Sequence, residues 1–481
     1  MNVSARRWGG GLARALWSAA LLVGCASPSF AGATYAERVR ERELPNGLRV
    51  LVLEDHKAPV AVLQLWYRVG SRNERPGYTG LSHLLEHMMF QGTKKLGPEE
   101  YSRIVRRNGG EDNAFTMRDA TVYFASIASD RYDVVLSMEA DRMRHLLLRE
   151  EAFETERSVV EEERRLRNED RPAAELFELL SATAYLAHPY QWPVIGWRDD
   201  IGKATVEDLR EYYRSYYGPA NAFLVVVGDV RADDVFRKVR RLFGRLEGPE
   251  EVPPVRAVEP PQEGERRVEL GRPAELPYVA VAYHVPNALH EDSAALEVLA
   301  AILAQGKSSR LYDRLVYRKR KALFATASYD RTSLDPGLFV LHAQPLPGVP
   351  VAELERHLLA EVARLREEQV GEEELERAKT ALEADFVFAQ DSLFYQAMLL
   401  GEHELLGDWR LLDRYLPAVR AVDAEDVREV ARRYLVRKNR TVGVLSPERT
   451  GKAPAAPKPH GAGAERPVTV VRRSDVRERD R

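Results

Sequence analysis

Residues 83–87 read His83-Leu84-Leu85-Glu86-His87, an H-x-x-E-H pattern that inverts the H-E-x-x-H order of many zinc sites. Residues four apart lie on one face of a helix, about one turn from each other, so His83 and His87 can bind the same ion. Glu86 lies at the edge of that face and can reach over the ion without binding it. Zinc lowers the pKa of a water that it binds to about 7, and a neighbouring carboxylate can take the proton. These are the parts of a metal-dependent peptidase.

A helix with two structural histidines on an apolar face is the alternative interpretation of this pattern. The chain contains 11 His, so a bare match can arise by chance. A third ligand decides between the two, because catalytic zinc usually has three protein ligands and one open position.

A candidate for the third ligand lies in residues 154–164, which read ETERSVVEEER. Helical periodicity places positions 156, 159, 160 and 163 on one stripe, so Glu163 is the expected inward carboxylate while Glu161 and Glu162 face outward. Glu156 shares the stripe and is expected to orient a ligand from behind. A solvated acidic face is the alternative, and the H-x-x-E-H pattern argues against it.

Length and charge limit the class of protein. A chain of 481 residues is expected to form two or more domains. With 30% charged and 44% hydrophobic residues its composition is that of a globular protein, and the net charge of -3 favours neither nucleic acid nor anionic lipid as a partner.

The N-terminus is typical of a secretory signal peptide over residues 1–31. Basic residues precede an apolar run over residues 15–24, which is too short to span a bilayer. Cleavage after Ala31 is one expectation. The other is a bacterial lipoprotein signal that ends before Cys25, the only cysteine in the chain, which would then carry a lipid anchor. Both place the mature chain in the bacterial cell envelope, in the periplasm or attached to the outer membrane.

Local patterns predict the order of elements after the signal. Asn46-Gly47 and the alternating run that follows predict a turn into a strand. Gly80 and Gly92 bound the helix of the H-x-x-E-H pattern. The other expected elements are strands over 60–69 and 223–227, a hairpin over 113–128, and helices over 98–108, 139–167 and 205–217.

The second part of the chain repeats the first. Residues 294–306 match 79–92 at an offset of 214, and residues 423–429 match 205–211 at an offset of 218. The metal positions become Glu297, Ala300 and Ala301 in the second copy, which therefore cannot bind zinc there.

These observations predict an α+β fold of two homologous domains, each a mostly antiparallel sheet layered with helices. We expect a zinc-binding domain over 35–246, a Pro-rich linker over 247–265, an inactive domain over 266–447 and a disordered tail over 448–481.

The motif, the Glu156 and Glu163 pair, with Glu163 lying 76 residues beyond His87, and the duplicated halves resemble the pitrilysin or insulinase-like (M16) zinc metallopeptidase family of inverzincins. In size the chain is similar to mitochondrial processing peptidase subunits and their bacterial relatives. The resemblance covers about residues 40 to 447.

The resemblance implies one Zn²⁺ per chain, bound by His83, His87 and Glu163, with Glu86 as general base. It also implies that a peptide substrate adds as an extra strand beside the edge residues Asn113, Ala114, Phe115 and Thr116. An ordinary hairpin edge is the alternative for that stretch. His188 matches a loop of the family and is expected to be structural.

One departure from the family bears on partners. Many relatives carry an Arg and a Tyr seven residues apart in the second half, and near Leu323 and Phe324 this chain lacks the tyrosine. Arg310 and Tyr317 have the spacing but occur earlier. We therefore expect a dimer, either of identical chains or with a metal-free homologous subunit that supplies the missing residues.

The predicted function is zinc-dependent hydrolysis of peptide bonds in peptides or unfolded segments. The alternative is a non-catalytic assembly or peptide-binding subunit on the same fold.

Overall fold

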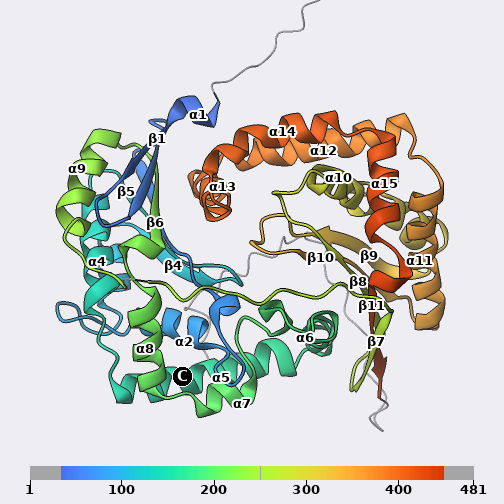
Figure 1. Cartoon of the computed structure of the whole chain (residues 1–481), viewed down its shortest axis with the longest axis horizontal. Coiled ribbons are helices and arrows are strands. Elements are labelled where there is room, and N and C mark those ends of the chain that lie inside the picture. The colour runs from blue at the N-terminus through green and yellow to red at the C-terminus, as the bar shows by residue number, and fades with distance from the viewer. Residues whose placement is uncertain (1–33, 250, 449–481) are drawn as a thin grey trace, which may run out of the picture. The chain divides into compact units, whose positions relative to one another are not determined.

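Two β-sheets organise the chain in the computed structural model, which describes residues 34–249 and 251–448 (Figure 1). The first sheet has six strands in the order β1-β2-β6-β3-β5-β4. Its strands are β1 (Val39–Glu43), β2 (Arg49–Glu54), β3 (Val60–Tyr67), β4 (Glu111–Thr116), β5 (Thr121–Ala128) and β6 (Ala222–Gly228).

The second sheet has five strands in the order β7-β11-β8-β10-β9. Its strands are β7 (Arg266–Arg272), β8 (Tyr278–Val285), β9 (Ala322–Tyr329), β10 (Gly337–Pro345) and β11 (Arg440–Pro447).

The two sheets share one topology. In the first, β2 pairs with β6 in parallel and the order continues β3, β5, β4 through antiparallel pairs. In the second, β7 pairs with β11 in parallel and β8, β10 and β9 follow in the same way. The duplication predicted from the repeats is therefore confirmed, and so is the α+β fold with mostly antiparallel sheets.

The central strands read as continuous apolar runs because both of their faces are covered. Every residue of β6 is buried, and so is all of β3 except its first residue. One face of the first sheet packs against helices of its own half, and the other packs against a helix of the second half. An alternating pattern is expected only where one face meets water.

Helices of the first half cover one face of its sheet and position the H-x-x-E-H motif. The contacts run from α2 to β4 and β5, from α4 to β3 and β5, and from α9 to β2. The helices of this half are α1 (Tyr35–Arg38), α2 (Leu81–Met88), α3 (Glu100–Arg107), α4 (Tyr132–His145), α5 (Glu150–Arg164), α6 (Pro172–Ala184), α7 (Arg198–Lys203), α8 (Val206–Tyr216) and α9 (Ala232–Phe243).

The helices of the second half are α10 (Ser293–Ala304), α11 (Val351–Glu367), α12 (Glu372–Ala389), α13 (Leu393–Leu405), α14 (Leu412–Ala421) and α15 (Ala424–Tyr434). The helix α10 takes the place of α2, and α15 takes that of α8. Both α8 and α15 begin with a capping box, formed by Thr205 and Asp208 in the first half and by Asp423 and Asp426 in the second.

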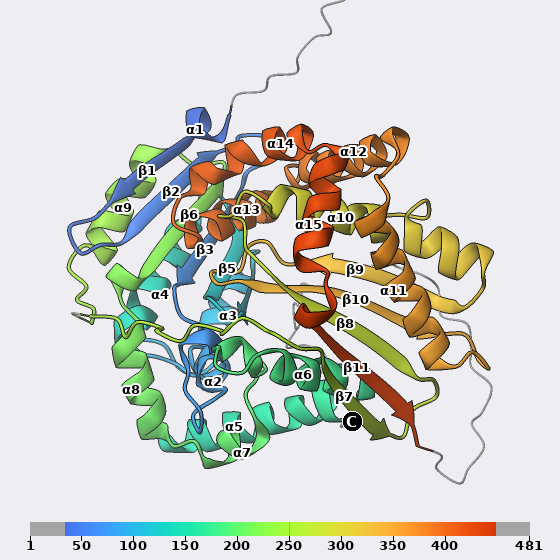
Figure 2. The same cartoon turned by 45° about the vertical axis from the view of Figure 1, so that its right-hand side comes forward.

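Each half gives one helix to the sheet of the other. The helix α6 packs on β7, β8 and β11, and α13 packs on β3 and β6 (Figure 2). Leu176 and Leu180 of α6 are buried against the second sheet, and Ala397 and Leu400 of α13 against the first. The exchange buries the second face of both sheets.

Two local predictions are wrong. The helix expected over 139–167 is two helices, α4 and α5, because the chain leaves α4 to make backbone bonds, with Leu147 N donating to Gly92 O at 3.1 Å. The stripe expected on α5 includes Val160 and Glu156, which are buried, but Val159 is 42% exposed.

Several predictions fall wholly or partly outside the described residues. The signal peptide, Cys25 and the tail from residue 449 onward lie there. The described part of residues 247–265 contains no helix or strand, and the domain boundaries remain predictions. Within the part of the chain that the structure describes, no helix is both long and apolar enough to cross a membrane.

Candidate metal centre

The helix α2 begins at a buried carboxylate. Gly80 precedes the helix with a φ of 91°, a left-handed conformation that glycine adopts without strain. Glu74 accepts hydrogen bonds from the backbone N–H groups of Gly80 and Ser82, each at 2.8 Å, so it satisfies two donors of the helix start. Burial raises the pKa of Glu74 to about 8. These bonds fix the first turn of the helix that carries both motif histidines.

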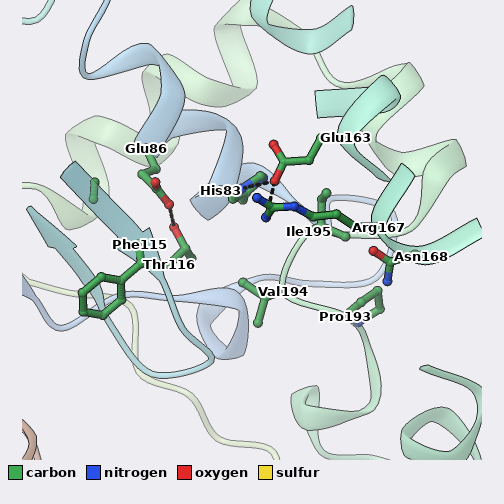
Figure 3. A pocket seen from close by; sticks show the side chains of 11 residues that line it. His83, Glu86, Phe115, Thr116, Glu163, Arg167, Asn168, Pro193, Val194 and Ile195 are labelled. Atoms are coloured by element: carbon green, nitrogen blue, oxygen red, sulfur yellow. Dashed lines mark hydrogen bonds and ion pairs between the residues drawn. The ribbon is translucent and has the colours of Figure 1, made fainter. Parts of the chain in front are cut away.

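His83, His87 and Glu163 converge where α2 crosses α5 (Figure 3 shows His83 and Glu163). His83 Nε2 lies 3.6 Å from Glu163 Oε1, and His87 Nε2 lies 3.4 Å from Glu163 Oε2. One ligand atom from each of the three side chains lies within 4.8 Å of the other two. Among the described residues this is the only such group of His, Cys, Asp or Glu side chains.

The three side chains fit a zinc ion. Tetrahedral zinc with ligand bonds of about 2.0–2.2 Å separates neighbouring ligand atoms by roughly 3.3–3.6 Å, which matches the two contacts of Glu163. Two imidazoles and one carboxylate are a common donor set for catalytic zinc and leave one position open. Glu163 Oε1 makes no hydrogen bond among the described residues, and its contact with Arg167 is an ion pair, so the atom remains available to a metal.

The charges of the cluster are already those that a metal requires, with one exception. Burial, with the charge of His87, lowers the pKa of His83 to about 3. Burial opposes charge on Glu163, but His87, His83 and Arg167 lower its pKa to about 2. Burial also opposes charge on His87, but hydrogen bonds to Glu156 and Glu163 raise its pKa to about 9. Without metal at neutral pH, His83 is therefore neutral and Glu163 is ionised, whereas His87 is a positively charged imidazolium.

Glu156 lies behind His87, as the sequence predicted for a residue that orients a ligand. Its Oε2 is 3.0 Å from His87 Nδ1, and its Oε1 accepts a hydrogen bond from Gln91. A carboxylate at Nδ1 keeps the proton there and leaves Nε2 free to bind a metal. The side chain of Glu156 is buried.

Glu86 faces the edge strand β4. Thr116 Oγ1 donates a hydrogen bond to Glu86 Oε2 at 2.6 Å (Figure 3). The strand is the last of its sheet and pairs only with β5 among the described strands. Ala114, Phe115 and Thr116 line a pocket of about 250 Å³ together with His83, Glu86 and Glu163, whereas Asn113 lies on the same strand outside this lining.

No motif in the sequence pointed to the other side of the pocket. That side is formed by Arg167 and Asn168, which lie on a π-helix (Arg165–Glu169), and by residues 193–195. Arg167 belongs to a run of charged residues, and a run of that kind usually indicates a solvated face. Its guanidinium Nη1 is instead 2.5 Å from Glu163 Oε1.

The remaining candidates do not join the cluster. Glu297 occupies the place of His83 in the second half, and it accepts a hydrogen bond from Tyr415 at 2.9 Å. His188 contacts Asp335 at 2.9 Å, as expected of a structural residue. Arg310 is buried and paired with Glu374, while Tyr317 is 72% exposed.

Known proteins are similar to this chain in sequence and in fold. The family model described as insulinase (peptidase family M16) matches residues 49–197, and that of the peptidase M16 inactive domain matches residues 203–382. The chain is 34% identical to a protein of Helicobacter pylori named zinc protease PqqE, over 86% of this chain and 94% of the relative.

Solved structures agree with the sequence comparison. The crystal structure of a protease from Helicobacter pylori has a TM-score of 0.83 at 34% identity and covers 85% of this chain and 100% of its own. The periplasmic protease PqqL from Escherichia coli shares the fold at a TM-score of 0.71 and 18% identity, with coverage of 86% of this chain and 48% of PqqL. This chain belongs to the insulinase family of peptidases, M16.

Proposed function

We propose that this chain is a zinc-dependent endopeptidase that hydrolyses peptides or unfolded segments in the bacterial cell envelope. The observation that carries the proposal is the group of His83, His87 and Glu163 beside Glu86. The name zinc protease, given to a relative that is 34% identical, supports the same activity.

One zinc ion would be held by the two Nε2 atoms and the carboxylate of the cluster. When bound it would supply a Lewis acid and an acidified water, the chemistry that peptide hydrolysis requires. Glu86 would take a proton from the attacking water and pass it to the nitrogen of the leaving amine. Thr116 would hold the Glu86 carboxylate in place through its hydrogen bond.

The edge strand β4 supports an extended peptide as the substrate. Its outer edge has no strand partner among the described residues, and three of its side chains line the pocket. A peptide that adds to this edge would be bound through backbone hydrogen bonds, which recognise no particular sequence. Its scissile bond would then lie over the cluster.

The cellular setting and the oligomeric state are part of the proposal. The basic start and short apolar run at the N-terminus support export. The chain would act as a dimer, either of identical subunits or with a metal-free homologue. Light scattering of the purified chain, with its activity measured alone and with such a homologue, separates the two kinds of dimer.

Hydrolysis of a mixed quenched-peptide library by the purified mature chain tests the function. The wild type is compared with Glu86→Gln, and zinc content is measured for both. Glu162→Gln is a matched control, because this carboxylate lies one residue before Glu163 but is exposed and paired with Arg165.

The expected result is zinc-dependent turnover by the wild type and by Glu162→Gln, and its loss in Glu86→Gln with zinc retained. Turnover by Glu86→Gln equal to that of the wild type would refute the general-base role. Zinc-loaded wild type that lacks turnover, alone and with a homologous partner, would favour the peptide-binding alternative.

A further inference from the structure

A cationic side chain, that of Arg167, lies beside the metal cluster. Arg167 lines the pocket with His83, Glu86 and Glu163, and among the described residues it is the only Lys or Arg that does so. Its Nη1 lies 2.5 Å from Glu163 Oε1, and its side chain is 31% exposed. The contact is counted as an ion pair and not as a hydrogen bond. Arg167 is therefore held next to the cluster by its charge.

Arg167 faces the pocket because it lies four residues after Glu163, so both side chains are on one face of the helix. It belongs to the π-helix Arg165–Glu169, which follows directly on α5. Arg164 is anchored to Glu178 Oε1 at 2.7 Å and to Gly196 O at 2.7 Å. Arg165 is exposed and paired with Glu162. Only the third arginine of the run reaches the pocket.

Metal binding would change the partner of this guanidinium. Within the part of the chain that the structure describes, the one ion pair of Arg167 is with Glu163, and that carboxylate would become a metal ligand. The guanidinium would then be a cation beside a second cation, both facing a pocket open to substrate. Such a charge is stabilised by whatever negative charge enters the pocket. In peptide hydrolysis that charge develops on the carbonyl oxygen of the scissile bond.

Figure 3 shows where Glu86 and Arg167 lie relative to the cluster. Glu86, with Thr116, is on one side of His83, and Arg167, with Asn168, is on the other. A peptide carbonyl between them would have the proton acceptor on one side and a hydrogen-bond donor on the other.

We propose that Arg167 is a further catalytic residue, which donates a guanidinium N–H to the scissile carbonyl oxygen and stabilises the oxyanion. The inference rests on the proposed peptidase function. Water oxygen bonds to the carbonyl carbon, the C–N bond breaks, and Glu86 carries one proton from the water to the departing nitrogen. Arg167 remains protonated throughout, so it contributes charge and no proton.

Three variants test this role. Arg167→Gln removes the charge, Arg167→Lys keeps it without the planar fork, and Arg165→Gln is the matched control two residues away. For each zinc-loaded variant kcat, KM and the zinc dissociation constant are measured. Calorimetry then gives the affinity for a phosphinic tetrapeptide, in which a tetrahedral phosphinate replaces the scissile amide.

We expect kcat of Arg167→Gln to fall on the order of 100-fold, the usual effect of removing one oxyanion donor, while KM changes little. Affinity for the phosphinic peptide should fall in parallel with kcat, because turnover and binding of this peptide both depend on stabilising a tetrahedral anion. Zinc affinity should be unchanged or higher, because a neighbouring positive charge is removed. Arg167→Lys should be intermediate, and Arg165→Gln should match the wild type.

Two results would overturn the inference. One is weaker zinc binding by Arg167→Gln with full turnover at saturating zinc, which would mean that Arg167 only positions Glu163. The other is phosphinic peptide affinity equal to that of the wild type. Peptide binding needs no turnover, so this arm decides the role of Arg167 even if the chain proves inactive and the proposed function fails.

Discussion

Glu156 Oε2 lies 3.0 Å from His87 Nδ1, while Glu163 approaches Nε2 of the same ring at 3.4 Å. The imidazole is thus held between two carboxylates of α5 that are two turns apart. Gln91 donates to the other oxygen of Glu156 and fixes its orientation. The ring nitrogen that faces the cluster is therefore determined before any metal binds.

The first prediction concerns the contact between Glu156 and His87. Glu156→Gln removes the negative charge behind His87 but keeps an amide oxygen, so zinc affinity should fall about 10-fold, the lower end of the 10–100-fold range for such partners. Competition with a chelator of known affinity measures it. Glu154→Gln is the control, because Glu154 is exposed on the same helix and pairs with Arg157. Equal zinc affinities for the two variants would contradict the role given to Glu156.

Zinc binding should release more than one proton at pH 7, one from His87 and part of one from the zinc-bound water, whose pKa is about 7. Without metal, His87 is protonated below its pKa of about 9, whereas His83 and Glu163, with pKa values of about 3 and 2, already have the forms that bind metal. Zinc affinity should therefore rise more than tenfold per pH unit from pH 7 to about 9 and less steeply above that. Calorimetry in buffers of different ionisation enthalpy measures the proton count. Release of less than one proton at pH 7 would show that His87 is neutral in the metal-free protein.

Spacing and periodicity were enough to predict the cluster. His83 and His87 are four residues apart on one helix, and the stripe through Glu156 and Glu163 identified the carboxylates that face it. Glu163 does lie beside the two histidines, although Val159, on the same expected stripe, is 42% exposed. Glu156 and Val160 are buried on the face of α5 that contacts its neighbours. The helical period then places Glu163 on the same face.

Other features could not be predicted because they depend on contacts between distant segments. The break between α4 and α5 results from backbone bonds to residues 92–94. The exchange of α6 and α13 between the halves depends on how the two sheets pack. Arg167 was missed because it belongs to a run of charged residues, although its position four residues after Glu163 places it on the same helix face.

The hydrogen bond from Thr116 to Glu86 leads to a prediction about turnover. Thr116→Val keeps the shape of the side chain and removes the donor, so the Glu86 carboxylate loses this orienting hydrogen bond. A hydrogen bond to a charged group contributes about 1.5–3 kcal/mol, which corresponds to a fall in kcat of roughly 10- to 100-fold. Thr116→Ser retains the hydroxyl and should stay close to the wild type. Steady-state kinetics on one peptide decides, and equal rates for the Val and Ser variants would exclude the role.

The last prediction concerns the contact of α13 with the first sheet. A Cβ at Gly401 would lie 2.3 Å from two ring carbons of Trp66, which is fully buried and stacked on Phe223. The indole cannot move aside, because its N–H donates to Gln64 at 3.1 Å. Gly401→Ala should therefore lower the free energy of unfolding by about 1–3 kcal/mol, the usual cost of overpacking.

Urea denaturation of the zinc-loaded chain measures this effect, with Gly264→Ala as the control. A Cβ at Gly264 meets no atom within 4 Å, so that variant should unfold like the wild type. Zinc affinity of Gly401→Ala should be unchanged, because Trp66 packs on the face of the sheet opposite to α2. An unaltered unfolding midpoint would mean that α13 can shift on the sheet, and that the two halves are held together less tightly than their shared packing indicates.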